Sequence, residues 1–96
     1  MKQLQENQNF RVVKIELKAD ACMKRHIATS DACLLVEEGS ALLIYSGETY
    51  ELNKGETFVI PANEQHMLRV INDLKAWIIL ANGAEIRYAE PDGVYN

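Results

Sequence analysis

The stretch Gly55-Glu-Thr-Phe-Val-Ile-Pro61-Ala-Asn63-Glu-Gln-His66 decides the fold, because it indicates a turn, a short apolar strand, a second turn and then a histidine. The glycine suits a turn position with positive φ, and Thr57–Ile60 combines the β-branched and aromatic residues typical of a strand. Proline and asparagine favour the second turn, so His66 should open the next strand. A histidine beside a rigid turn has a fixed ring orientation, as a ligand or metal site requires.

The rest of the chain has the same two-residue period, with turn residues about every ten positions. Ser46-Gly47 and Asn82-Gly83 are typical of short hairpins, and Asn-Gly suits the type I′ turn. This pattern predicts an all-β protein, either a closed barrel or a sandwich. The predicted strands are Phe10–Lys18, Met23–Ile27, Ala32–Glu37, Ala41–Tyr45, Thr49–Leu52, Thr57–Ile60, Gln65–Ile71, Lys75–Ala81 and Glu85–Ala89.

The length of 96 residues, 48% of them hydrophobic, predicts one domain. We expect residues 1–9 to form an N-terminal arm, with at most one turn of helix at Lys2–Asn7, and residues 10–96 to form the barrel with a loose C-terminal tail. A domain of this size buries only about 60–65% of its unfolded surface, so association with a second copy would stabilise it.

Charge and hydropathy limit the partners. The 14 acidic and 10 basic residues give a net charge of −4 without a basic cluster, which argues against nucleic acid and anionic membranes as partners. No stretch approaches the roughly 20 apolar residues of a membrane span, and the first residues lack an apolar signal segment, so we expect a cytoplasmic protein. Cys22 and Cys33 have no metal or redox spacing and are predicted to be small buried thiols.

The segment Gly55–His66 is similar to the second conserved motif of the cupins, which is a glycine, five residues, a proline, one residue, a glycine or asparagine, two residues and a histidine. In compact cupins the first motif ends at a glycine sixteen positions earlier, here Gly39, and this alignment places its first histidine on His26. Its second histidine and its glutamate fall on Ala28 and Ala32. The resemblance spans about residues 14–80 and implies a single-domain, cupin-type conical β-barrel (a jelly roll) with an internal pocket.

The resemblance also implies a possible metal site. Cupins that bind iron, manganese, nickel or zinc use three histidines and one glutamate, and this chain retains only the positions of His26 and His66. Asp31, at the start of a strand, is the best candidate for a further ligand, whereas strand alternation turns Cys33 away. We therefore expect either no cofactor or one divalent transition metal (Zn, Fe, Mn or Ni) held by the two histidines.

Alternation also predicts the pocket wall. If His66 faces inward, Leu68 does too, as does Leu34 on the His26 side. Phe58, Ile60, Trp77 and Ile79 are expected to complete the apolar wall. A pocket of this kind selects a small, partly hydrophobic ligand and orients it with one or two imidazole hydrogen bonds. The predicted ligand-binding residues are His26, His66, Leu34, Phe58, Leu68 and Trp77.

Three functions fit these residues, and whether the protein is an enzyme is left open. The first is a small-molecule-binding cupin with a reduced two-histidine pocket. The second is a metal-dependent cupin enzyme of the dioxygenase, isomerase or lyase type that uses His26 and His66. The third is a metal-free enzyme in which a histidine takes a proton and a tyrosine, Tyr45 or Tyr88, returns it.

A homodimer is predicted as well. Along Phe10–Lys18 the residues Val13, Ile15 and Leu17 form one apolar face, which is fit to cover an edge of its own sheet or of a partner's. Small barrel proteins that resemble this chain look like dimers built through such strands.

Overall fold

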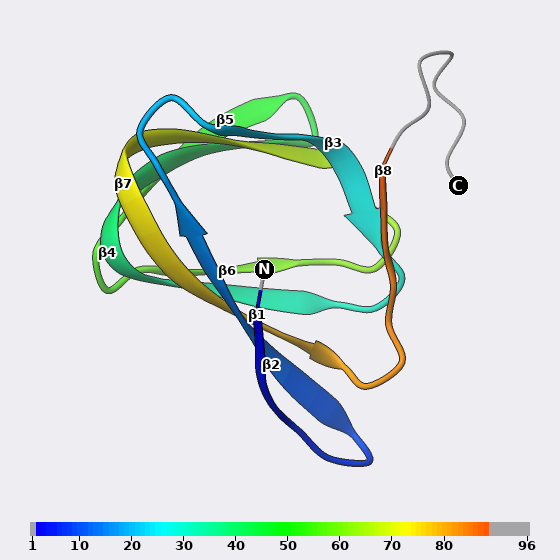
Figure 1. The fold of residues 1–96 in the computed structure, drawn as a ribbon. Coiled ribbons are helices and arrows are strands. Elements are labelled where there is room, and N and C mark those ends of the chain that lie inside the picture. Colours follow the sequence, from blue (N-terminus) through cyan, green and yellow to red (C-terminus); the bar gives the residue numbers. More distant parts are fainter. Residues whose placement is uncertain (1, 89–96) are drawn as a thin grey trace.

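The computed structural model describes residues 2–88, and every regular element in this range is a β-strand (Figure 1). The predicted all-β class is thus confirmed. None of the described residues forms a helix able to cross a membrane, and the predicted loose tail lies outside the described residues. The strands are β1 (Lys2–Glu6), β2 (Phe10–Leu17), β3 (Cys22–Ala28), β4 (Ala32–Tyr45), β5 (Glu48–Asn53), β6 (Thr57–Ile60), β7 (His66–Ala81) and β8 (Ile86–Tyr88).

Two long strands, β4 and β7, run through both layers of the barrel and pair with each other along most of their length. The first half of β4 and the second half of β7 lie in one layer with β1, β2 and β6. The second half of β4 and the first half of β7 lie in the other layer with β3, β5 and β8. All these pairings are antiparallel, as in the expected jelly roll.

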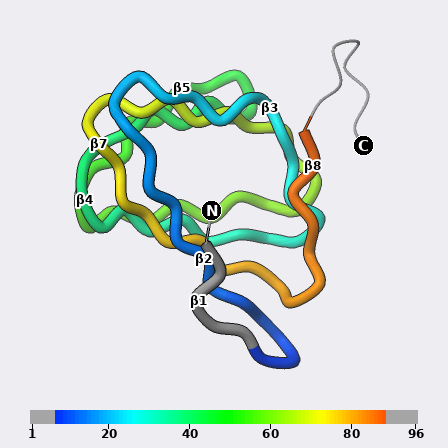
Figure 2. The backbone as a smooth tube through the Cα atoms, in the orientation of Figure 1, coloured from blue at the N-terminus to red at the C-terminus, as the bar shows by residue number. Residues whose placement is uncertain are grey.

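The layers meet where β4 and β7 bend together, on the left of Figures 1 and 2. The sequence predicted strand breaks at Glu38-Gly39 and Asn72-Asp73, and both predictions are wrong. The two turn-forming segments lie opposite each other, so pairing resumes beyond a register shift and the strands turn a corner instead of ending. Gly39 adopts φ of 84°, and the Asn72 side-chain amide donates to the Ser40 hydroxyl at 2.8 Å.

The two predicted hairpins have different outcomes. Ser46 and Gly47 both have positive φ, 53° and 77°, and join β4 to β5 as predicted. At Asn82-Gly83 only the glycine has positive φ, and the amide of Ala84 donates to the carbonyl of Ala81 at 3.1 Å. This turn leads to β8, which pairs with β3 rather than with β7, so the hairpin predicted there is wrong.

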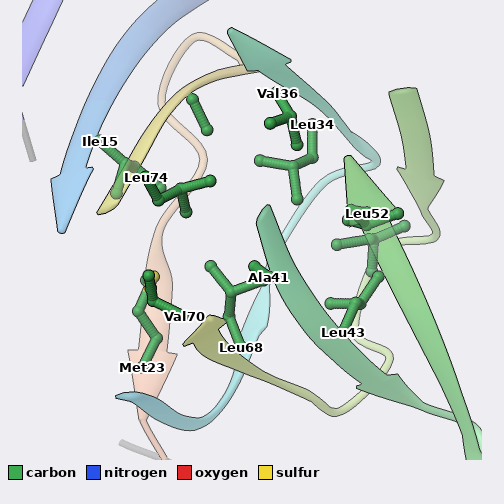
Figure 3. Close-up of a cluster of buried hydrophobic side chains, with 12 residues drawn as sticks. Ile15, Met23, Leu34, Val36, Ala41, Leu43, Leu52, Leu68, Val70 and Leu74 are labelled. Atoms are coloured by element: carbon green, nitrogen blue, oxygen red, sulfur yellow. The ribbon is translucent and has the colours of Figure 1, made fainter. Parts of the chain in front are cut away.

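The core fills the space between the layers, with aliphatic side chains from both converging on it (Figure 3). Ile15 on β2 is 2% exposed, so the apolar face of this strand covers the protein's own core. The segment expected as an arm contains β1, which pairs with β2 in place of the helical turn considered at Lys2–Asn7. Cys22 is exposed and Cys33 half-buried because each neighbours an inward-facing residue, so the prediction of two buried thiols is wrong.

Candidate functional site

His26 and His66 are direct cross-strand partners on β3 and β7, although forty positions separate them in the sequence. Their ring centroids are 4.1 Å apart and their planes are inclined by 63°. Both residues are buried, with exposed fractions of 4% and 7%. The pair therefore forms a single polar feature in an otherwise apolar part of the barrel.

Backbone carbonyl groups orient both rings in the same way. The Nδ1 atom of His26 donates to the carbonyl oxygen of Lys24 at 2.6 Å, and Nδ1 of His66 donates to that of Glu64 at 3.0 Å. A carbonyl oxygen only accepts hydrogen bonds, so the proton of each neutral ring is on Nδ1 and the lone pair is on Nε2. Each ring thus presents an acceptor, or a metal-ligating atom, at Nε2.

Burial keeps both rings neutral at physiological pH. Desolvation lowers the pKa of His26 to about 4, assisted by the neighbouring His66 and opposed by the hydrogen bond to the Lys24 carbonyl. Burial likewise lowers the pKa of His66 below 6.5, against the opposing effect of the Glu64 carbonyl. Two neutral imidazoles with free Nε2 atoms can accept hydrogen bonds or ligate a metal without first losing a proton.

The pair opens onto a small cavity inside the barrel with a volume of about 30 Å³. This is room for a water molecule or for one small chemical group. Apart from the two imidazoles, only apolar side chains line the cavity. Its lining residues are Ile15, Met23, His26, Ala28, Ala32, Leu34, Leu43, Ile60, His66, Leu68, Ile78, Leu80 and Ile86.

The donor set for a metal is incomplete. Ala28 and Ala32, at the positions where cupins carry further ligands, line the cavity with methyl groups. Residues 7–88 contain no group of three or more His, Cys, Asp and Glu side chains able to hold a metal ion. Asp31 does not complete the set, because its Oδ1 accepts a hydrogen bond from the amide of Ala62 at 2.8 Å and so fastens the turn before β7.

The predicted apolar wall is only partly found around the cavity. Leu34, Ile60 and Leu68 line it, whereas Phe58, Trp77 and Ile79 do not. Phe58 shares the parity of the lining residue Ile60 but packs against the rings of Tyr45 and Tyr50.

Trp77 faces outward, with Nζ of Lys14 5.2 Å from its ring centroid. Side-chain alternation counted from His66 along β7 places the even-numbered residues inside the barrel, so it excludes Trp77 from the cavity wall. The same count identifies Ile78 and Leu80, two lining residues that the sequence prediction missed.

Two tyrosines extend the histidine pair into a row across four adjacent strands. Tyr45 on β4 lies directly opposite His66, and Tyr88 on β8 lies directly opposite His26. The ring centroids of Tyr88 and His26 are 5.2 Å apart. Because directly paired residues share a face of the sheet, the row is Tyr45, His66, His26 and Tyr88.

A larger groove of about 480 Å³ shares His66 with the cavity. Its wall comes from β3, from the end of β4 and the turn that follows it, and from the start of β7 and the turn before it. The sequence prediction missed Arg25 in this wall, for which adjacency to His26 was the one available signal. The lining residues are Arg25, Ile44, Tyr45, Ser46, Gly47, Asn63, Glu64, Gln65, His66 and Met67.

Residues 1–68 match the family model described as mannose-6-phosphate isomerase, cupin domain. The matched range includes both histidines and the alanines at the two replaced ligand positions. No curated protein shows a significant match to the sequence.

Solved structures share the fold at low sequence identity. KdgF from Halomonas sp. is 20% identical with a TM-score of 0.78, over 83% of this chain and 74% of that protein. A cupin superfamily protein from Desulfitobacterium hafniense is 14% identical with a TM-score of 0.77, over 82% and 72% of the two chains. Salicylate 1,2-dioxygenase from Pseudaminobacter salicylatoxidans is 19% identical with a TM-score of 0.76, and 82% of this chain spans 25% of that protein.

Proposed function

This chain belongs to the mannose-6-phosphate isomerase cupin-domain family, and from that membership we propose that it binds a small molecule at the pair of His26 and His66. The observation that carries the proposal is the pair itself, two neutral rings at 4.1 Å in the wall of an apolar cavity. An apolar site with a few convergent polar groups is the usual setting for a small-molecule ligand.

The chemistry of the rings defines what the ligand must offer. Since Nδ1 of each histidine donates to a backbone carbonyl, Nε2 is left as an acceptor. The ligand therefore needs a hydrogen-bond donor, such as a hydroxyl or an N–H group. Since the cavity holds only about 30 Å³, that donor group enters it and the bulk of the molecule stays outside.

Phenol and toluene test this requirement, because they share an apolar ring and only phenol carries a donor. We expect phenol to shift the Nε2 resonances of His26 and His66 in long-range ¹H–¹⁵N spectra and to raise the melting temperature, whereas toluene does neither. The double variant His26→Phe/His66→Phe should lose the stabilisation by phenol.

Trp77→Phe is the matched control for that experiment, because its ring lies on the outer face. It should respond to phenol as the unaltered protein does. Equal effects of phenol and toluene, or histidine resonances that do not move at saturating phenol, would contradict the proposal.

The second candidate is a metal-dependent cupin enzyme of the dioxygenase, isomerase or lyase type. The tautomer of the two histidines supports this candidate. Both rings are neutral and carry their proton on Nδ1, so both Nε2 atoms are available to ligate a metal. A divalent transition metal fits the site in part, since His26 and His66 would supply two ligands and water the others. When bound, such an ion would supply Lewis acidity.

Metal content distinguishes the two candidates. The metal-dependent enzyme requires stoichiometric zinc, iron, manganese or nickel in protein purified without chelators, lost in both His26→Ala and His66→Ala. The binding protein requires stabilisation by phenol in the presence of excess EDTA. Three predictions from the sequence are compatible with either function and stay predictions. They are a homodimer, a cytoplasmic location and the division into residues 1–9 and 10–96.

A further inference from the structure

The cavity and the groove differ greatly in size, and this difference indicates where most of a ligand would lie. The internal cavity has about 30 Å³ and the groove about 480 Å³, and His66 is the residue common to both walls. The groove therefore offers the room that the cavity lacks for the rest of a molecule that contacts His66. The side chains that line the groove then select the ligand.

Among those side chains Arg25 is the only cation, and its position results from a local irregularity of β3. The register between β3 and β7 shifts between Met23 and His26, so two consecutive residues, Lys24 and Arg25, are exposed. Shifts of this kind redirect side chains and are frequent beside functional sites. Here the redirected guanidinium belongs to the residue next to His26 in the chain and shares a groove with His66.

Within residues 7–88 no carboxylate forms an ion pair with Arg25, whereas several other basic side chains are paired. Lys14 pairs with Glu16 and Glu37, Lys75 with Glu38, and Arg87 with Glu85. As far as the described residues go, the guanidinium of Arg25 therefore has donors available for another acceptor. Arginine suits oxyanions because its planar group can donate two parallel hydrogen bonds.

We propose that Arg25 binds an anionic group of the ligand, so that the ligand class is a small carboxylate or phosphate with an apolar body and a hydrogen-bond donor. The proposal rests on the proposed function, since His66 takes the donor. The apolar body faces Ile44 and Met67, which line the same groove. Glu64 is the opposing charge in this wall and weakens anion binding.

Three related probes test the proposal in calorimetric titrations. They are 4-hydroxybenzoate, its neutral amide 4-hydroxybenzamide, and 4-hydroxyphenyl phosphate. A charge-assisted hydrogen bond is about twice as strong as a neutral one, so at least one of the anions should bind about tenfold more tightly than the amide. The comparison of the two anions identifies the preferred oxyanion.

Arg25→Gln should bring the affinity for the preferred anion to within about twofold of that for the amide, and Arg25→Lys should restore part of the difference. Lys24→Gln is the matched control, because it removes the same charge one residue away and outside the groove lining. It should leave the preference for the anion unchanged. Glu64→Gln should tighten the binding of the anion by removing the opposing charge.

The outcomes separate this inference from the proposed function. If phenol binds at the histidines but neither anion binds better than the amide, or if Arg25→Gln retains the preference, the role of Arg25 is refuted and the histidine pocket stands. If phenol itself fails to engage the histidines, the proposed function fails first. An equal loss in Arg25→Gln and Lys24→Gln would indicate general surface charge and would also overturn the inference.

Discussion

Gly39 packs so closely on Asp73 that a Cβ atom at this glycine would lie 2.0 Å from the backbone carbonyl oxygen of Asp73. This contact joins β4 to β7 at the corner where the two strands pass from one layer to the other. The backbone of Gly39 also has φ of 84°, a conformation that L-residues rarely adopt. The corner therefore requires glycine for two independent reasons.

Gly39→Ala should lower the free energy of unfolding by about 3 kcal/mol or more, because the methyl group would have to displace backbone atoms. Gly47→Ala is the matched control, with φ of 77° but no atom within 4 Å of the added Cβ. We expect it to cost only about 1–2 kcal/mol, the cost of the left-handed backbone alone. Urea unfolding measures both, and equal losses would contradict the assigned contact.

Stability should fall as the pH is lowered from 6.5 to 4. His26 has a pKa of about 4 in the folded protein and 6.5 in the unfolded chain, so the unfolded chain binds the proton more readily between these values. The contribution of the neutral ring is fully present above pH 6.5 and is lost as the pH approaches 4. We expect a loss of about 2–3 kcal/mol from His26, with a further loss in the same direction from His66.

His26→Gln isolates this contribution, because carboxylates elsewhere titrate equally in both proteins. Urea unfolding at pH 7, 6, 5 and 4 should show a shallower loss for the variant. Parallel curves for the two proteins would show that the ring is not desolvated.

A carboxylate added to the cavity should create a stronger metal site. Ala32 lines the same cavity as the two histidines and stands where the cupin motif has its glutamate. Ala32→Glu should raise the affinity for Co²⁺ at least about tenfold, because the site gains a charged oxygen ligand. Ala32→Gln is the control of similar size without the charge. Visible absorption of Co²⁺ reports the coordination, and equal affinities in the two variants would refute the shared site.

The outer face of one layer should mediate the predicted homodimer. Ile79 and Val59 are 40% and 62% exposed there and both lie opposite Cys33, so apolar side chains form a row across the strands. Ile79 also lies opposite Val12 on β2. In sedimentation velocity at micromolar concentration we expect a dimer that Ile79→Lys converts to a monomer.

Ile71→Lys is the control for the dimer, because Ile71 is also 40% exposed and lies on the same strand. It should leave the dimer intact. A monomeric mass for the unaltered protein, or equal effects of the two lysine substitutions, would contradict the assigned face.

The sequence contained much of the fold because its signals were local and periodic. Thr57–Ile60 was predicted with its observed bounds, since turn residues delimit it on both sides. The breaks at Gly39 and Asn72 were misjudged because each segment alone has the composition of a turn. Only their pairing across the sheet shows that both strands continue, and pairing between distant segments is not encoded in local propensity.

The sequence likewise predicted only part of the site. The two histidine positions followed from motif spacing, whereas their hydrogen bonds to backbone carbonyls have no sequence signature. Asp31 was a reasonable third ligand until the structure showed its carboxylate bonded to the amide of Ala62. The groove and Arg25 depend on a register shift in β3 that hydrophobic alternation does not reveal.

β4 and β7 each continue from one layer into the other, so the two layers of the barrel share these strands and are not joined by a flexible linker there. A motion that separated the two layers would break the hydrogen bonds between β4 and β7 at the corner. The three-residue strand β8 pairs with β3 as its one strand partner among the described elements, and it carries Ile86 at the cavity and Tyr88 beside His26. Exchange of backbone amide hydrogens should therefore be faster in β8 than at the corner where β4 and β7 pair.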